Sequence, residues 1–100
     1  MFSKTKKAQT LEVKEDFKDP MLQFKLEDDT IIYEIPIRNI LDTEIINLRK
    51  YRKIDKLIQI IFMEDKQRLR IIRLNVQDNQ IECLNHKIQE LIIKMTAYKP

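Results

Sequence analysis

The sequence predicts a small α+β domain in which antiparallel β-hairpins form a small sandwich or partly open barrel, capped by one C-terminal amphipathic helix. Over residues 22–37, apolar side chains alternate with polar ones, as they do in strands that bury one face, and short apolar runs follow at 57–63 and 68–76. From Ile81 to Met95 the apolar side chains recur at helical spacing instead. The chain has 100 residues, which is enough for one domain with one core.

The first hairpin is predicted around the polar pair Asp28 and Asp29. Residues 22–27 alternate before this pair, and residues 30–37 alternate after it. Two alternating runs around a two-residue polar break are typical of a β-hairpin. In the second run, one face holds four residues that we expect to be buried: Ile31, Tyr33, Ile35 and Ile37.

Pro36 lies inside the second of these runs and limits how that strand can pair. Proline has no N–H to donate, so the nitrogen of Pro36 must face an unpaired edge or a strand end. The apolar spacing also changes from two to three between Ile37 and Ile40. We therefore expect the chain to leave this sheet near residue 37 and to re-enter the core at Ile40 through a turn.

A second hairpin is predicted from the apolar runs at 57–63 and 68–76. In the later run the apolar residues change face after Arg70, which predicts a bulge or a strand with both faces partly covered. Residues 44–51 allow a further strand or a helical turn. An alternative stays open in which residues 45–75 are helical, because their apolar residues also fit a helical stripe.

A C-terminal helix is expected over residues 79–96. Asn79 is followed three residues later by Glu82, which fits a capping box. An isolated helix of this length is marginal in water, so its apolar stripe must dock on the strands. The stripe consists of Ile81, Leu84, Ile88, Leu91, Ile92 and Met95.

Residues 1–20 are mostly polar and are predicted to form a tail that a partner would order. The remaining residues, 21–100, would form the single domain. Leu11 and Val13 alternate with polar residues, so one weak N-terminal strand is the alternative to an unstructured tail.

Composition disfavours several classes of protein. The chain contains no glycine, so the glycine-rich phosphate loops of nucleotide-binding proteins cannot be built. It has one cysteine, Cys83, so no internal disulfide can form, and we expect a reducing compartment. The expected location is the cytoplasm, with association with the cytoskeleton as one option. Its apolar runs are too short to cross a membrane, and it shows no secretory signal pattern, so neither a transmembrane nor a secreted protein is expected.

No catalytic or metal-binding motif is predicted. Cys83 and His86 lie three residues apart on the expected helix, but a closed zinc site needs four ligands and no second Cys/His pair exists. As a nucleophile and a base they would lack a third, orienting group. Asp28 and Asp29 are interpreted as a turn, because adjacent side chains in a tight turn diverge. We therefore expect no enzymatic activity, cofactor, metal or small-molecule substrate.

Positive charge is concentrated between residues 49 and 73, which carry nine basic and three acidic side chains. One cluster lies at 49–56 and another at 66–73, and the two would lie side by side if the predicted second hairpin forms. Such a patch attracts an acidic protein surface, a phosphate head group or a nucleic-acid backbone, with an ordinary solvated surface as the alternative. The predicted partner-binding residues are Arg49, Lys50, Arg52, Lys53, Lys56, Arg68 and Arg70.

The hairpins and terminal helix together resemble the pleckstrin-homology-like superfold, which includes GRAM-type domains. Two stretches carry the resemblance: TIIYEIPIRNI at 30–40 and RLRIIRLNVQDNQIECLNHKIQELI at 68–92. Over about residues 22–96, it implies two nearly orthogonal antiparallel sheets closed at one end by the helix. Members of this superfold bind phosphoinositide head groups or protein segments and are not enzymes. The helix here lacks their common tryptophan, and the early basic segment lacks the Arg-x-Arg ending of a phosphoinositide-binding hairpin.

These observations predict a non-enzymatic protein-binding module that acts as a small structural or adaptor subunit of a larger assembly. The expected partner is another protein with an acidic surface or tail, which the basic residues would contact. One alternative is a membrane-recruitment module that binds phosphoinositide through the same residues, and another is a helical interaction protein. Nucleic acid is disfavoured, because only Tyr51 is expected to be an exposed aromatic residue amid the basic clusters.

Overall fold

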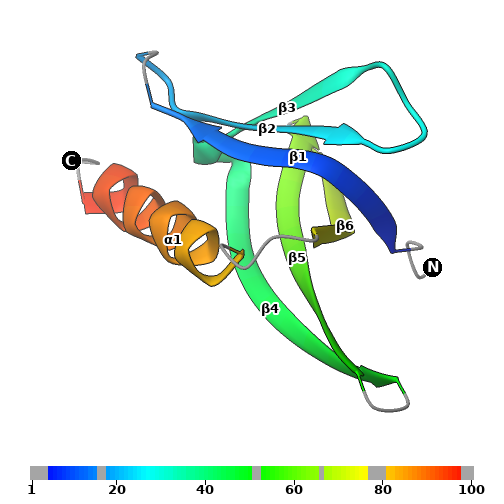
Figure 1. Cartoon of the computed structure of the whole chain (residues 1–100). Coiled ribbons are helices and arrows are strands. Elements are labelled where there is room, and N and C mark those ends of the chain that lie inside the picture. The colour runs from blue at the N-terminus through cyan, green and yellow to red at the C-terminus, as the bar shows by residue number, and fades with distance from the viewer. Residues whose placement is uncertain (1–4, 16–17, 51–52, 66, 77–80, 98–100) are drawn as a thin grey trace.

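The computed structural model describes residues 5–15, 18–50, 53–65, 67–76 and 81–97. Within these residues the chain forms six strands and one C-terminal helix, which confirms the α+β class (Figure 1). A short 3-10 helix, η1 (Ile37–Asn39), connects the third strand to the fourth. The other elements are β1 (Lys6–Lys14), β2 (Met21–Leu26), β3 (Ile32–Pro36), β4 (Ile40–Lys50), β5 (Lys53–Asp65), β6 (Arg68–Val76) and α1 (Ile81–Ala97).

The strands form one mixed sheet in the order β3-β2-β1-β6-β5-β4. It consists of two antiparallel three-stranded meanders, β1–β2–β3 and β4–β5–β6, which cross steeply in Figure 1. The prediction of purely antiparallel pairing is wrong at one place, because β1 pairs with β6 in parallel. Within each antiparallel meander the first and third strands run in the same direction. Because η1 turns the chain without reversing it, β4 runs in the same direction as β3, and β1 and β6 therefore run in the same direction too.

The predicted N-terminal tail is wrong for the residues that form β1. This strand lies in the middle of the sheet, with β2 on one side and β6 on the other. Its first residues pair with β6, where Lys6 lies opposite Leu74, and its later residues pair with β2, where Val13 lies opposite Leu22. The weak strand that Leu11 and Val13 allowed is therefore an integral part of the domain. A boundary at residue 20 does not describe the fold.

The corner predicted at Pro36 is confirmed. Met21 lies opposite Pro36 in the β2–β3 ladder, and the Ile37 N–H donates a hydrogen bond to the Pro20 carbonyl at 3.0 Å. Along an antiparallel ladder, residue pairs joined by backbone hydrogen bonds alternate with pairs that are not. Because Ile37 is bonded to Pro20, the next pair, Met21 and Pro36, is a non-bonded one. The nitrogen of Pro36 therefore faces the free edge of β3, and Ile40 re-enters the core after η1.

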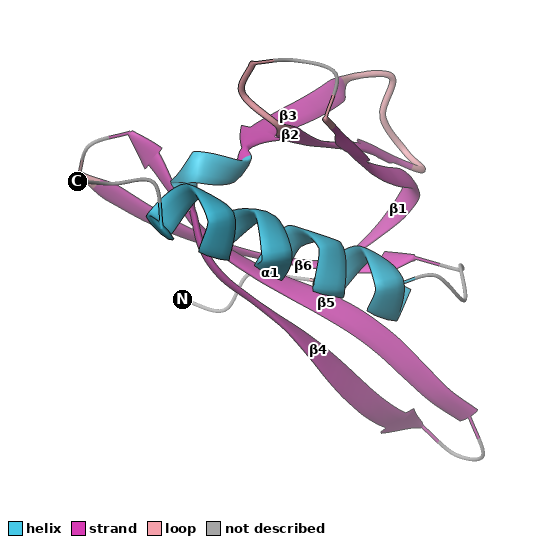
Figure 2. Ribbon diagram, turned by 90° about the vertical axis from the view of Figure 1, so that its left-hand side faces the viewer, coloured by secondary structure: helices cyan, strands magenta, loops and turns pink. Residues whose placement is uncertain are grey.

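The alternative of a helical segment at 45–75 is wrong. Most of that segment is the end of β4 and the β5–β6 hairpin, and the second predicted hairpin is thereby confirmed. The helix α1 contacts β4, η1 and β1 (Figure 2), so its docking on strands is confirmed. The Gln89 Nε2 donates a hydrogen bond to the carbonyl oxygen of Thr43 at 3.0 Å. The expected cap residue Asn79 lies outside the described residues.

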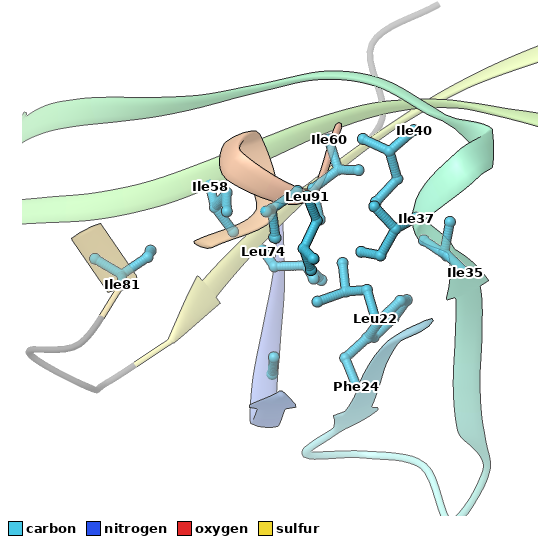
Figure 3. Packing of buried hydrophobic residues seen from close by; sticks show 12 residues of the cluster. Leu22, Phe24, Ile35, Ile37, Ile40, Ile58, Ile60, Leu74, Ile81 and Leu91 are labelled. Carbon is cyan, nitrogen blue, oxygen red and sulfur yellow. The ribbon is translucent and has the colours of Figure 1, made fainter. Parts of the chain in front are cut away.

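The core lies between the two meanders and the helix (Figure 3). Leu22 and Ile35 from the first meander meet Ile58 and Ile60 from the second, and Ile88 comes from α1. Its buried members are Ala8, Leu22, Phe24, Ile35, Ile37, Ile40, Ile58, Ile60, Leu74, Ile81, Ile88 and Leu91. Packing of these side chains is the main stabilising contribution to the fold.

Two apolar positions differ from expectation. Ile31 was expected to be buried, but it precedes β3 in the loop and its exposed fraction is 55%. The change of face in β6 does not come from a bulge in that strand, because its register with β5 is continuous from Leu69 to Asn75. Instead, Leu69 and Ile71 lie exposed on the outer face of the sheet, while Leu74 is buried in the core.

Candidate functional site

The ends of β4 and β5 form a two-stranded arm. Residues 53–56 of β5 have register partners on β4, whereas the pairing of β5 with β6 begins only at Leu57. This arm, residues 46–50 and 53–56, reaches beyond the other strands in Figure 1, in a molecule whose principal extents are 49 × 27 × 24 Å. We call it the basic arm, because these described residues include four basic residues and one acidic residue.

Four of the seven predicted partner-binding residues lie in the described part of the basic arm. Arg49 and Lys56 are exposed, and the Lys56 ammonium forms an ion pair with Glu82 at the start of α1. Lys50 and Lys53 are register partners at the end of the arm. For these two lysines the structure describes the backbone alone, and Arg52 lies outside the described residues.

The other two predicted residues are not on the same surface. Arg68 lies opposite Asp65, whereas Lys53 begins β5. These ends of β5 are about 40 Å apart at roughly 3.3 Å per residue. The expected adjacency of the two basic clusters therefore fails for Arg68 and Arg70, although the predicted hairpin formed. Arg73 of the second cluster lies opposite Gln59, near the middle of β5.

Arg70 is also committed to a local ion pair. Its Nε donates to Oε2 of Glu64 at 2.7 Å, and its Nη2 donates to Oε1 of the same carboxylate at 3.3 Å. The hydrogen bond from Arg70 to Glu64 raises the pKa of the guanidinium above its ordinary value. Such a bidentate pair reduces the positive charge that this end of the sheet offers to a partner.

A groove opens between the two meanders, and we call it the open groove. Its volume is about 600 Å³, which lies in the range of ligand-binding clefts. One wall comes from β2 and β3 and the other from β5 and β6. Its apolar lining includes Phe24, Leu26, Tyr33, Ile35, Phe62, Ile72 and Leu74, and its charged residues are Lys6, Glu34, Glu64, Arg70 and Arg73.

The tyrosine in this groove is held by two neighbours. The ring of Tyr33 stacks on that of Phe24, with centroids 5.2 Å apart, and its hydroxyl donates a hydrogen bond to Oδ2 of Asp29 at 2.7 Å. The Ile31 N–H donates to the other carboxylate oxygen at 3.1 Å. The Tyr33 bond is the main cause that lowers the pKa of Asp29, and the same bond raises the pKa of Tyr33. Asp29 therefore closes the turn and fixes one wall of the groove.

The remaining candidate chemistry does not converge on a site. Cys83 is exposed on α1, and the imidazole Nε2 of His86 lies 3.0 Å from Oε1 of Glu90 on the same helix. Across the described residues, no group of three or more His, Cys, Asp or Glu side chains could hold a metal ion. Among the same residues, no helix is long and apolar enough to cross a bilayer.

Sequence reasoning found the basic cluster at 49–56 but missed the open groove. Basic residues adjacent in the chain stay adjacent across a hairpin, so the cluster at 49–56 could be read directly. The groove takes side chains from β2, β3, β5 and β6, and only the pairing of β1 with β6 brings these walls together. Comparisons of the chain with protein-family models, curated proteins and solved structures found no match.

Proposed function

We propose that this protein is a non-enzymatic protein-binding module, a small structural or adaptor subunit that contacts an acidic partner through the basic arm. The observation that carries the proposal is the arm itself. Among the described residues no third strand pairs with its outer end, and four of its nine described residues are basic. Two of these basic residues, Arg49 and Lys56, are exposed and available to a partner.

The register of the arm also favours an anionic partner. Lys50 and Lys53 are directly opposed register partners, and like charges in that position destabilise a hairpin. An acidic surface close to the arm would remove this repulsion. Opposite charges would also speed the encounter and make it sensitive to salt.

Charge reversal on the arm tests the proposal. The test variant is Arg49→Glu with Lys53→Glu, and the matched control is Lys18→Glu with Lys94→Glu, which gives the same net charge away from the arm. The probe is a fluorescently labelled poly-glutamate peptide in low salt. We expect binding to weaken about ten-fold or more in the test variant and about two-fold or less in the control. Equal weakening in both would show that only net charge matters, and would overturn the proposal.

The same variants separate a protein partner from a membrane. Vesicles that contain phosphoinositide are sedimented with each variant, beside vesicles of equal charge made with phosphatidylserine. We expect no preference for phosphoinositide, because a two-stranded arm offers a ladder of charges and not an enclosed head-group site. Binding that rises with phosphoinositide content and is lost in the arm variant would favour the membrane-recruitment alternative.

The finer fold assignment is also part of the proposal. Two meanders that meet at steep angles, joined at the Pro36 corner and by β1 with β6, support a pleckstrin-homology-like arrangement. The docking of α1 across β4 and η1 supports it further. The adaptor function does not depend on this assignment, since fold likeness alone does not define function.

A further inference from the structure

The sheet has two edges, β3 and β4, and they differ in how they are covered. α1 lies against β4, where Gln89 donates to the Thr43 carbonyl. On β3, every second residue belongs to a pair that is not joined by backbone hydrogen bonds to β2. Like Pro36, Ile32 and Glu34 are in such pairs. The N–H and C=O groups of Ile32 and Glu34 therefore point away from β2, toward the free edge.

An edge of this kind is a template for another strand. The exposed fraction of the Ile32 side chain is 61%, and that of Ile31 just before it is 55%. Natural proteins protect such edges with charge or proline because unpaired strands pair with other chains. Here Pro36 limits pairing at one end, while Ile31 and Ile32 leave the other end apolar.

The open groove runs along this same edge. Four consecutive residues of β3, from Tyr33 to Pro36, line it, and Ile72 and Phe62 line the facing wall. Side chains alternate between the two faces of a strand. A strand added to β3 would thus direct every second side chain into the groove, against the inward-facing Tyr33 and Ile35.

The charge of the groove sets the chemistry of that strand. Lys6 is opposite Leu74 in the parallel pair, and Arg70 is opposite Phe62, so both cations stand beside apolar inward-facing residues. Glu64 balances Arg70 through the bidentate pair, and no such ion pair is seen for Lys6 among the described residues. One acidic side chain in the groove would complement this arrangement.

We infer that β3 and the open groove bind an extended peptide segment of another protein, which adds to the sheet as a strand beside β3. The segment has apolar side chains at alternate positions and one acidic residue near Lys6. This site lies at the opposite end of β5 from the basic arm and does not depend on the arm's proposed role. It would give the module a second, sequence-selective contact, in which main-chain bonds supply affinity and the groove supplies specificity.

The inference is tested by selecting a phage-displayed library of random dodecapeptides on the full-length protein. Enriched peptides should share apolar residues two positions apart and an acidic residue. With a selected peptide bound, hydrogen exchange measured by NMR should slow about ten-fold or more at the Ile32 and Glu34 amides. The Tyr33 and Ile35 amides already bond to β2 and should change much less. Failure to enrich peptides, or unchanged exchange at Ile32 and Glu34, would overturn the inference.

Two pairs of variants locate the contact. Glu34→Pro removes an outward N–H without breaking the β2 ladder and should weaken peptide binding about ten-fold, whereas Glu34→Thr keeps the N–H and should bind within about two-fold. Lys6→Glu should weaken binding of the acidic peptide about five-fold or more, while Lys7→Glu, on the other face of β1, should not. Oleate serves as a competing probe. If it fills the groove and selected peptides bind Glu34→Pro normally, the occupant is an apolar ligand and the inference fails.

Discussion

Ala8 of β1 lies opposite Val76 of β6 in the short parallel pair that joins the two meanders. The exposed fraction of Ala8 is 4%, although its neighbours in the chain, Lys7 and Gln9, are both exposed. A mostly polar segment therefore forms a central strand, and only a few of its side chains face the core. The pairing of β1 with β6 holds the second meander beside the first, so the N-terminal residues should matter for stability.

Substitution at Ala8 should show this dependence. Ala8→Glu would place a carboxylate in the core without a partner and should lower the free energy of unfolding by about 3 kcal/mol or more. Lys7→Glu is the control, because it adds the same side chain at an exposed position and should cost about 0.5 kcal/mol or less. Urea unfolding followed by circular dichroism measures both. If Ala8→Glu unfolds like wild type, then β1 is the dispensable tail that the composition suggested.

The elements that could be predicted are those whose own apolar pattern is strong. β2 and β3 alternate clearly, β5 and β6 contain short apolar runs rich in isoleucine, and the α1 stripe has helical spacing, so local pattern was sufficient to predict them. β1 was predicted only as a weak strand, because Ala8 is small and Leu11 and Val13 are only partly buried, and its central place in the sheet was missed. The ladders with β6 at its start and with β2 over the rest hold this strand in the sheet, and apolar periodicity does not report such pairing.

The candidate site divides in the same way. The basic cluster at 49–56 is local in sequence and was predicted, whereas the places of Arg68 and Arg70 depend on the length of β5. Two clusters on paired strands can lie side by side or at opposite ends of a hairpin, and only the strand lengths and register decide between these arrangements. The open groove needed the long-range pairing of β1 with β6, which three register pairs establish and no periodicity reveals.

The docking of α1 should depend on Ile88. Its side chain is fully buried, whereas that of Ile93 on the same helix is 68% exposed. Ile88→Ala should lower the free energy of unfolding by about 2–5 kcal/mol through lost burial and the resulting cavity. Ile93→Ala makes the same chemical change in the same helix and should alter it by about 0.5 kcal/mol or less. Similar losses at both positions would mean that α1 does not pack as described.

The turn at Asp29 should give the fold a component of acid sensitivity. The hydrogen bond from Tyr33 lowers the pKa of Asp29 from its ordinary value of 3.8. A carboxyl group with a lowered folded-state pKa stabilises the fold above its unfolded pKa, and this contribution is lost as pH falls through the folded pKa. Stability should therefore decrease as the pH falls below about 4.

The variant Tyr33→Phe isolates this contribution. It removes the hydroxyl and keeps the ring stacked on Phe24, so the pKa of Asp29 should rise toward 3.8. Carbon-detected NMR titration of the Asp29 carboxyl group measures the shift directly. Asp29→Asn should remove the same acid-dependent part of stability, and combining the two substitutions should add little. An unchanged titration midpoint in Tyr33→Phe would show that the bond does not persist in solution.

Pro36 should protect the edge of β3 more than it stabilises the fold. Its nitrogen faces away from β2, so Pro36→Val loses no ladder bond and should change the free energy of unfolding by about 1 kcal/mol or less. The substitution does, however, add an outward N–H beyond Ile32 and Glu34. A longer free edge pairs more readily with other chains, so self-association should rise about ten-fold in sedimentation velocity experiments.

Met21→Val is the matched control for that experiment, because Met21 is the register partner of Pro36 but does not lie on the edge. It introduces the same β-branched side chain into the same pair of residues. Self-association should stay at the wild-type level in this variant. If instead Pro36→Val lowers the free energy of unfolding by several kcal/mol and the variant stays monomeric, the nitrogen of Pro36 does not face the free edge. The outward direction assigned to the backbone groups of Ile32 and Glu34 would then be wrong as well.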